Sequence, residues 1–228
     1  MFNLKKVLTV AGFCPFLLTS FCAPASAIVE AKAPALDSSL KVCLKEDAPL
    51  NLKLVHTPFH EIIKPLADLI SKGEGDYNAV NRGYAGDTPG GIQGLTGKTF
   101  ENFTVGQVMD MQATWLYAVG CYQFIPVTLR FAVAMSDVDR LDMFTPEVQN
   151  KLFAALVLYK RPAVGAYIRG NHNLIGWALN ELAFEWASVE YRRGRGYYDH
   201  IGGNRAHISR TDAERVLREV RQSYERNK

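Results

Sequence analysis

The stretch PFHEIIKPLADLISKGEG, residues 58–75, decides the fold expected for this chain. Its apolar side chains recur at the three- and four-residue spacing of one helix face, at Phe59, Ile62, Ile63, Leu66, Leu69 and Ile70. Thr57-Pro58 is a start signal and Gly73 a stop signal, while Pro65 indicates either a kink or a later start. We therefore expect a helix over residues 58–72 that ends immediately before Glu74.

Glu74 is the candidate catalytic acid. Donating a proton near neutral pH requires a carboxyl group that stays protonated, so its surroundings must disfavour negative charge. The negative end of the helix dipole, the nearby carboxylate of Asp76 and partial burial would each raise the pKa of Glu74. By itself, the tripeptide Gly73-Glu74-Gly75 is more typical of a helix cap followed by a solvated acid. The assignment therefore depends on the other motifs of the chain.

Residues 1–27 have the pattern of a secretory signal peptide. Lys5 and Lys6 precede an apolar stretch, and Ala25-Ser26-Ala27 forms a small-residue cleavage site. Cleavage near Ala27 predicts a periplasmic or secreted protein. We expect residues 28–55 to form a linker and an N-terminal arm, and residues 56–228 to form one folded domain with a basic C-terminal helix.

The charge of the chain is nearly balanced, with 26 Lys and Arg against 23 Asp and Glu and a formal net charge of +3. This balance argues neither for nor against a polyanionic partner. Residues 192–228 are more basic, with ten Lys and Arg against five Asp and Glu. A solvated helix face explains this excess most simply, and contact with an anionic cell-wall or membrane surface is the alternative.

Two cysteines, Cys43 and Cys121, remain after cleavage of the leader in a chain directed to an oxidising compartment. A disulfide between them would tether the N-terminal arm beside Tyr122 and Gln123. The alternative is one buried thiol and one incidental thiol, and the sequence leaves the two alternatives open.

The rest of the chain indicates an α+β fold that is mostly α. Residues 76–98 are rich in Gly and Asn and predict a loop with a small β-hairpin next to the first helix. Start signals then predict five further helices, at Thr104-Val105-Gly106-Gln107, Pro126, Thr145-Pro146, Asn173 and Thr211-Asp212.

Three blocks of sequence together resemble the lysozyme-fold muramidases of the phage lambda endolysin type. They are Ser71-Lys72-Gly73-Glu74-Gly75, Gly120-Cys121-Tyr122-Gln123-Phe124-Ile125-Pro126, and Glu185-Trp186-Ala187-Ser188 followed by Gly196-Tyr197-Tyr198. The similarity covers residues 58–204. It implies a lysozyme-like fold and cleavage of the β-1,4 bond between N-acetylmuramic acid and N-acetylglucosamine in peptidoglycan. The family usually has a basic residue where this chain has Cys121.

The resemblance also implies roles for individual residues. Glu74 would be the general acid, and Tyr122 and Gln123 would bind sugar hydroxyl and acetamido groups from the opposite wall of the cleft. Trp186 and Tyr198 would stack on sugar faces. Trp186 also lies on an apolar helix stripe, where a core position is the alternative.

A hydrolase of this kind needs a second carboxylate, whereas a lytic transglycosylase manages with one because the muramic 6-hydroxyl attacks. Asp76 is too close to Glu74 in sequence to reach across a bound sugar, so Asp87 is the preferred second acid. An ordinary turn would also explain Asp87. Asn81 and Gln93 are candidate sugar ligands from the same segment, and equally candidates for bonds to their own backbone.

The function expected from the sequence is therefore that of an exported muramidase that remodels the cell wall. Lytic transglycosylation with 1,6-anhydro products is one alternative, and a non-catalytic peptidoglycan-binding or assembly factor for an envelope or secretion complex is another. We expect glycan strands as the partner and a monomeric protein. We expect no cofactor, no nucleic-acid partner and no stable membrane insertion. We also expect no metal, since the five histidines have no metal-ligand spacing.

Overall fold

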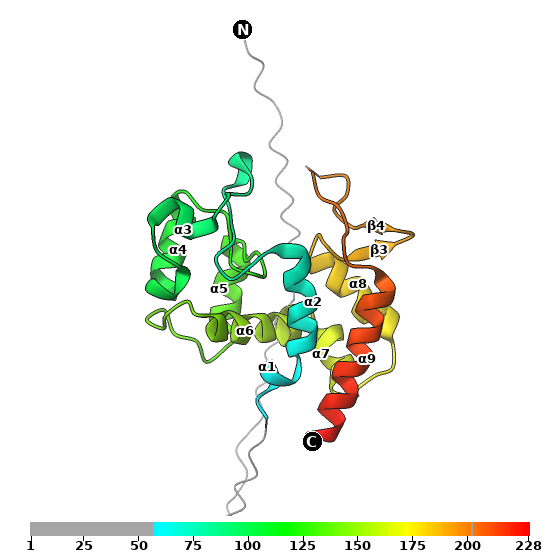
Figure 1. Cartoon of the computed structure of the whole chain (residues 1–228). Helices are drawn as coiled ribbons and strands as arrows, with labels where there is room; N and C mark the ends of the chain where they lie inside the picture. The colour runs from blue at the N-terminus through cyan, green and yellow to red at the C-terminus, as the bar shows by residue number, and fades with distance from the viewer. Residues whose placement is uncertain (1–56, 202) are drawn as a thin grey trace, which may run out of the picture. The chain divides into compact units, whose positions relative to one another are not determined.

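The computed structural model describes residues 57–201 and 203–228 (Figure 1). These residues belong to one compact unit of the chain, which begins at Leu52. The predicted signal peptide, the predicted linker and arm over residues 28–55, and Cys43 lie outside the described residues. In the part of the chain that the structure describes, no helix combines the length and the apolar character needed to span a bilayer.

The described residues are mostly helical and include two small antiparallel sheets, which agrees with a mostly-α member of the α+β class. In chain order the elements are α1 (Phe59–Ile62), α2 (Lys64–Glu74), β1 (Val80–Asn81), η1 (Gly83–Ala85), α3 (Gly91–Thr96), η2 (Phe100–Asn102), α4 (Val105–Thr114), β2 (Ala118–Val119), α5 (Pro126–Ala134), α6 (Pro146–Ala155), η3 (Leu156–Lys160), α7 (Pro162–Ile168), α8 (Ile175–Glu185), β3 (Glu190–Arg192), β4 (Arg195–Gly196) and α9 (Arg210–Arg226). Of the short helices, η1 and η2 are 3-10 turns and η3 is a π-helical turn.

The segment 58–72 forms two helices, because Pro65 sits in the first turn of α2 and the chain breaks at Ile63. Of the two predicted effects of Pro65, the structure therefore has the later start. The expected stop at Gly73 is wrong: α2 continues through Glu74 and ends at Gly75, whose φ of 141° is accessible mainly to glycine. Glu74 is consequently the last residue of the helix.

Local start signals located three of the other helices, α4, α5 and α6. The capping box between Thr104 and Gln107 is formed, and the side chain of Thr145 caps α6. Two predicted caps are wrong. Leu174 rather than Asn173 precedes α8, and the hydroxyl of Ser209 caps α9, two residues before the predicted start.

The sheet beside α2 is not the predicted hairpin within residues 76–98. Instead β1 pairs with β2, which lies almost forty residues later in the chain, and Val80 is opposite Val119. Within the 76–98 segment only an isolated bridge joins Asn81 to Asp87. A second hairpin, β3–β4, precedes α9.

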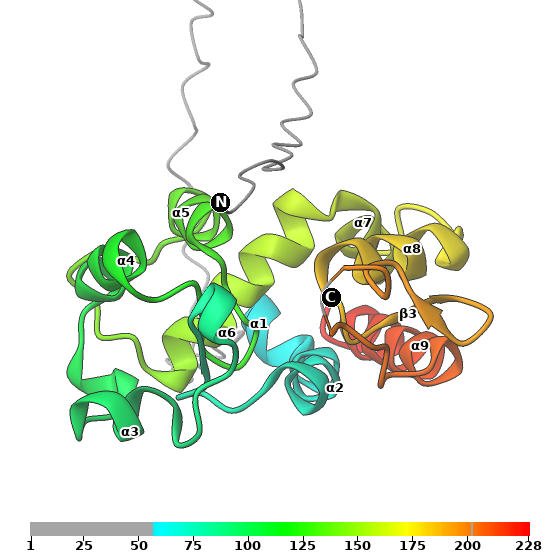
Figure 2. The same cartoon turned by 90° about the horizontal axis from the view of Figure 1, so that it is seen from above.

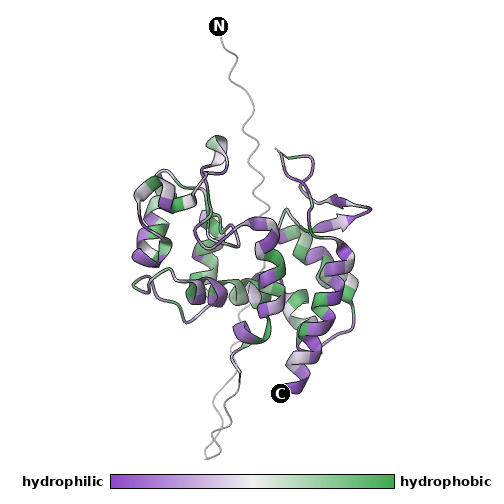
Figure 3. Cartoon of the chain, in the orientation of Figure 1, coloured by the Kyte–Doolittle hydropathy of each residue, from purple (hydrophilic) through white to green (hydrophobic). Residues whose placement is uncertain are grey.

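The core forms where the apolar stripes of the helices meet. Ile63, Leu66 and Ile70 at the start and inner face of α2 are fully buried, and α2 packs against α9 (Figures 1 and 2). Figure 3 shows hydrophobic and hydrophilic residues alternating along α9, whose Leu217 and Val220 face the core. Each large apolar side chain buried in this way stabilises the fold by about 1.5–3 kcal/mol. This packing holds the end of α2, and with it Glu74, in place.

Candidate active site

Glu74 is held at the end of α2 by a contact from a distant part of the chain. The backbone N–H of Ser188 donates a hydrogen bond to Oε1 of Glu74 at 3.1 Å. Ser188 follows α8 and is 3% exposed. The side chain of Glu74 is thus partly withdrawn from solvent and fixed at one oxygen.

Burial raises the pKa of Glu74, and the nearby negative charge of Asp87 raises it further. Hydrogen bonding from Ser188 and the nearby imidazole of His207 act in the opposite direction. The pKa of Glu74 is therefore shifted in the expected direction, but the carboxylate that contributes to the shift is Asp87 and not Asp76. Asp76, which we expected to contribute, is exposed and accepts the N–H of Asn78 at 2.8 Å.

Glu74 lies between two hollows in the surface. The larger, about 740 Å³, is called the groove here, and it is bounded on one side by Asn81 and Asp87 and on the other by Ser188 and Tyr198. In Figure 1 the segment around η1 and the loop after β4 rise above the end of α2 and carry these walls. A second hollow of about 440 Å³ adjoins it. Glu74, Asp87 and Gln123 line both, so an extended ligand can pass on either side of Glu74.

The predicted second acid, Asp87, lies in the same groove as Glu74. It is exposed, and its Oδ1 accepts a hydrogen bond from Nδ2 of Asn81 at 2.8 Å. The backbone bridge between Asn81 and Asp87 brings the two side chains to the same place. Asn81 therefore orients the carboxylate of Asp87, which leaves its second oxygen accessible to a ligand or to water.

Gln123, Gln93 and Tyr198 also line the two hollows. Gln123 is half-buried between the two hollows, and its φ of 47° is uncommon for a residue other than glycine. Gln93 is exposed in the second hollow. Tyr198 lines the groove, and its hydroxyl donates to the carbonyl of Phe184 at 2.8 Å, which leaves the ring as the surface available to a ligand.

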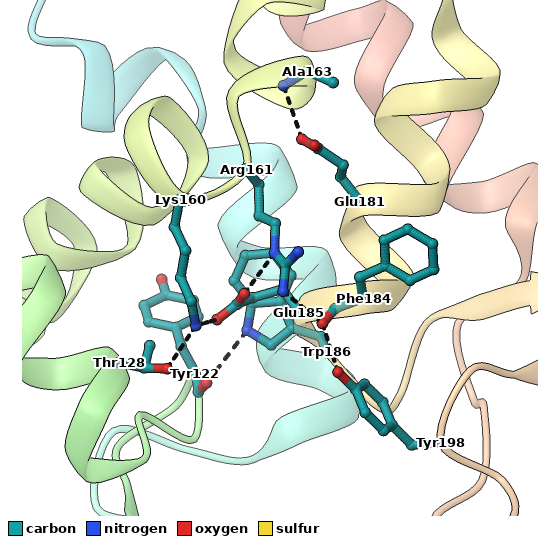
Figure 4. A network of polar contacts seen from close by, with 10 residues as sticks. All are labelled: Tyr122, Thr128, Lys160, Arg161, Ala163, Glu181, Phe184, Glu185, Trp186 and Tyr198. Atoms are coloured by element: carbon teal, nitrogen blue, oxygen red, sulfur yellow. Dashed lines mark hydrogen bonds and ion pairs between the residues drawn. The ribbon is translucent and has the colours of Figure 1, made fainter. Parts of the chain in front are cut away.

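Tyr122 and Trp186 were expected to contact the substrate, and the structure corrects both. Each is 2% exposed and packs against Phe153 in the core. The indole N–H of Trp186 donates to the carbonyl of Tyr122 at 3.3 Å (Figure 4). The hydroxyl of Tyr122 bonds Oδ1 of Asn150. Large aromatic side chains suit a core as well as a sugar face, and here the core position prevails.

A partly buried cluster of charges lies beside the wall of the groove that carries Tyr198 (Figure 4). The carboxylate of Glu185, at the end of α8, accepts from Nζ of Lys160 at 2.6 Å and from Nε of Arg161 at 2.7 Å. Arg161 also donates to the carbonyl of Phe184 at 2.7 Å, the same carbonyl that Tyr198 bonds. The cluster thereby joins the end of η3, the end of α8 and the groove.

Several groove residues were not identified as site residues from the sequence. Ser188, His207, Arg205 and Tyr117 all line the groove, and the Tyr117 side chain is well exposed there. Ser188 stood within one of the quoted sequence blocks but carried no role. Arg205, His207 and Tyr117 lie in loops with no motif, so only the tertiary structure identifies them.

Gly73 and Ser188 fit together so closely that glycine is required at position 73. A Cβ added to Gly73 would lie 2.4 Å from Cβ and 2.6 Å from Oγ of Ser188. Gly→Ala inside a helix normally stabilises by about 0.5–1 kcal/mol. Here we expect Gly73→Ala to lower the free energy of unfolding by about 1–2 kcal/mol, because the overlap outweighs that gain. Urea unfolding measures the change.

The matched double variant isolates this contact. Ser188→Gly removes the two atoms that a Cβ at position 73 would meet most closely and leaves Cδ1 of Ile208 at 3.1 Å, so Gly73→Ala combined with Ser188→Gly should be more stable than Gly73→Ala alone. A single Gly73→Ala variant that unfolds at higher urea concentration than the wild type would contradict the expected overlap.

Cys121 is buried, and burial raises the pKa of its thiol to about 12. As a thiol it therefore stays protonated at neutral pH and is unsuited to act as a nucleophile. Because Cys43 lies outside the described residues, the disulfide between Cys43 and Cys121 stays a prediction. Among residues 57–201 and 203–228, no group of three or more His, Cys, Asp and Glu side chains is arranged to hold a metal ion.

Comparisons with known protein families, with curated proteins and with solved structures find no match to this chain.

Proposed function

We propose that this protein is a muramidase of lysozyme-like fold that cleaves the β-1,4 bond between N-acetylmuramic acid and N-acetylglucosamine. One observation carries the proposal: a partly buried carboxyl group with a raised pKa lies between two adjoining hollows that share a second carboxylate. This arrangement suits a glycan chain that is bound on both sides of the cleaved bond. The resemblance of three sequence blocks to endolysins of the phage lambda type agrees with it.

In the proposed reaction Glu74 donates its proton to the glycosidic oxygen as the bond to C1 breaks. Burial raises the pKa of Glu74 and so favours its protonated form, and the peptide N–H of Ser188 donates to the carboxylate that remains. The positive charge that develops on the sugar ring is stabilised by the carboxylate of Asp87 across the groove.

Asp87 completes the reaction either by activating water or by attacking C1 directly. Its hydrogen bond from Asn81 leaves one carboxylate oxygen for that task, which favours hydrolysis over transglycosylation. Asn81, Gln123 and Gln93 supply amide groups for sugar hydroxyl and acetamido groups, and Tyr198 supplies an aromatic face.

The proposed setting is the bacterial periplasm or the cell exterior, after removal of the predicted leader near Ala27. Glycan strands of peptidoglycan are the proposed partner, and remodelling of the wall, on its own or for an envelope or secretion complex, is the proposed role.

Incubation of the purified protein with sacculi tests this proposal, with mass spectrometry of the soluble products. We expect muropeptides with reducing ends. Products lighter by one water, with 1,6-anhydro ends, would show that the protein is a lytic transglycosylase and not a hydrolase. Sacculi that retain the protein but release no muropeptides would favour a peptidoglycan-binding factor instead.

A further inference from the structure

Ser188 makes two approaches to the segment that carries Glu74. Its peptide N–H donates to Oε1 of Glu74, across a sequence separation of 114 residues. Its side chain fills the space where a Cβ at Gly73 would lie, with Oγ 2.6 Å from that position. The hydroxyl is therefore pressed against the backbone immediately before Glu74, and the absence of a side chain at position 73 makes this approach possible.

The hydroxyl oxygen of Ser188 is buried but has no hydrogen-bond partner within residues 57–201 and 203–228. Buried hydroxyl groups nearly always have a partner. Ser188 lines the groove beside Glu74, and its side chain lies close enough to act on the pKa of that carboxyl group, which can accept the hydroxyl proton. A neutral carboxyl group gains little from such a donor, whereas a carboxylate gains much more.

We propose that Ser188 is a positioning residue, whose N–H and hydroxyl together bind the carboxylate that Glu74 becomes when it gives up its proton. This inference rests on the proposed function. In the step concerned, the O–H bond of Glu74 breaks and its proton moves to the glycosidic oxygen, which retains the electron pair of its bond to C1. The electron pair of the O–H bond remains on Glu74 as negative charge, and the two donors of Ser188 point at that charge.

The catalytic value of this arrangement is that it acts mainly after proton transfer has begun. Interactions that strengthen as charge develops lower the barrier, whereas interactions present equally beforehand do not. Burial and the charge of Asp87 oppose ionisation of Glu74, while Ser188 and the nearby imidazole of His207 favour it. Ser188 thus keeps Glu74 able to lose its proton in spite of burial.

The test is Ser188→Ala, which removes only the hydroxyl and retains the Cβ that packs on Gly73. We expect kcat on sacculi to fall by about tenfold or more, which is the loss typical of one hydrogen bond to a charged group. Loss of a donor to the carboxylate also raises the pKa of Glu74. Because the protonated acid is the active form, the alkaline limb of the pH–rate profile should then move to higher pH.

The pKa of Glu74 is also measurable without substrate, by NMR titration of its side-chain carboxyl carbon. Ser136→Ala is the matched control, since that hydroxyl donates to the carbonyl of Val133, accepts the N–H of Val138 and lies outside the groove. We expect the control to leave the titration and kcat unchanged.

The outcomes separate this inference from the function on which it rests. A Ser188→Ala protein with unchanged Glu74 titration overturns the inference even if kcat falls, because a purely structural role would then explain the loss. The muramidase assignment would stand in that case, since it is judged from products released by the wild-type protein. A wild-type protein that releases no muropeptides overturns both.

Discussion

Replacing Glu74 with glutamine is expected to lower the rate of muropeptide release by about two orders of magnitude or more. The amide matches the carboxyl group in shape and can still accept the N–H of Ser188, but it has no proton to give to the glycosidic oxygen. The release of soluble muropeptides from sacculi measures the rate. Glu101→Gln is the matched control, because Glu101 is an exposed glutamate on η2 outside both hollows.

Glu74→Gln should also change the pH dependence of Tm, and a measured Tm shows that the variant is folded. The pKa of Glu74 is raised in the folded protein, so its contribution to stability is present below the unfolded pKa and is lost as pH rises through the folded pKa. Glutamine does not titrate and escapes this loss. The Tm of Glu74→Gln relative to the wild type should therefore be higher at about pH 8 than at about pH 4.

Two results would contradict the assignment of Glu74. One is release of muropeptides at close to the wild-type rate by Glu74→Gln. The other is a Glu101→Gln control that loses as much activity as Glu74→Gln, which would point to a general effect of removing acidic groups.

Replacing Glu185 with glutamine is expected to lower the free energy of unfolding by about 3 kcal/mol. The Glu185 side chain is 5% exposed and faces two cations, Lys160 and Arg161, whose side chains are 28% and 22% exposed. The substitution leaves both cations without their counter-charge and sets an amide N–H₂ group against one of them. Because the cations retain some contact with water, the loss should lie at the lower end of the range for broken buried ion pairs, about 3–5 kcal/mol.

The exposed ion pair between Lys151 and Glu147 provides the matched control for this prediction. The Glu147 side chain is 67% exposed, and Glu147→Gln should change stability by less than about 1 kcal/mol. Urea unfolding of the two variants and the wild type makes the comparison. Equal losses in Glu185→Gln and Glu147→Gln would show that the charge cluster beside the groove wall contributes no more than a surface pair.

Helix positions were determined largely by the sequence alone, because their signals are local. The capping box of Thr104 and Gln107 and the Thr145-Pro146 start need only neighbouring residues to act. Helix ends were less certain for the same reason. At Gly73 the local pattern predicted a stop, but the helix continues through Glu74 and is capped by Gly75. Gly73 instead lies inside the helix, where Ser188 packs against it.

The sequence alone also identified Glu74 and Asp87 as candidate acids, and the structure places both in one groove. The sequence did not determine the sheet, because β1 and β2 come together from segments far apart and short strands carry little pattern. Nor did it decide the places of Tyr122 and Trp186, since an aromatic ring has equal reason to bury itself or to face a sugar.

Only the tertiary structure brought Ser188 to Glu74. No sequence pattern indicates which residue a serine after a helix will contact. The contact forms because the segment that follows α8 lies against the end of α2. The residue types at the site were thus determined by sequence, whereas burial, the charges that act on Glu74 and the donors that face it were decided by packing. The pKa of a carboxyl group depends on what surrounds it in space, and sequence separation does not report that.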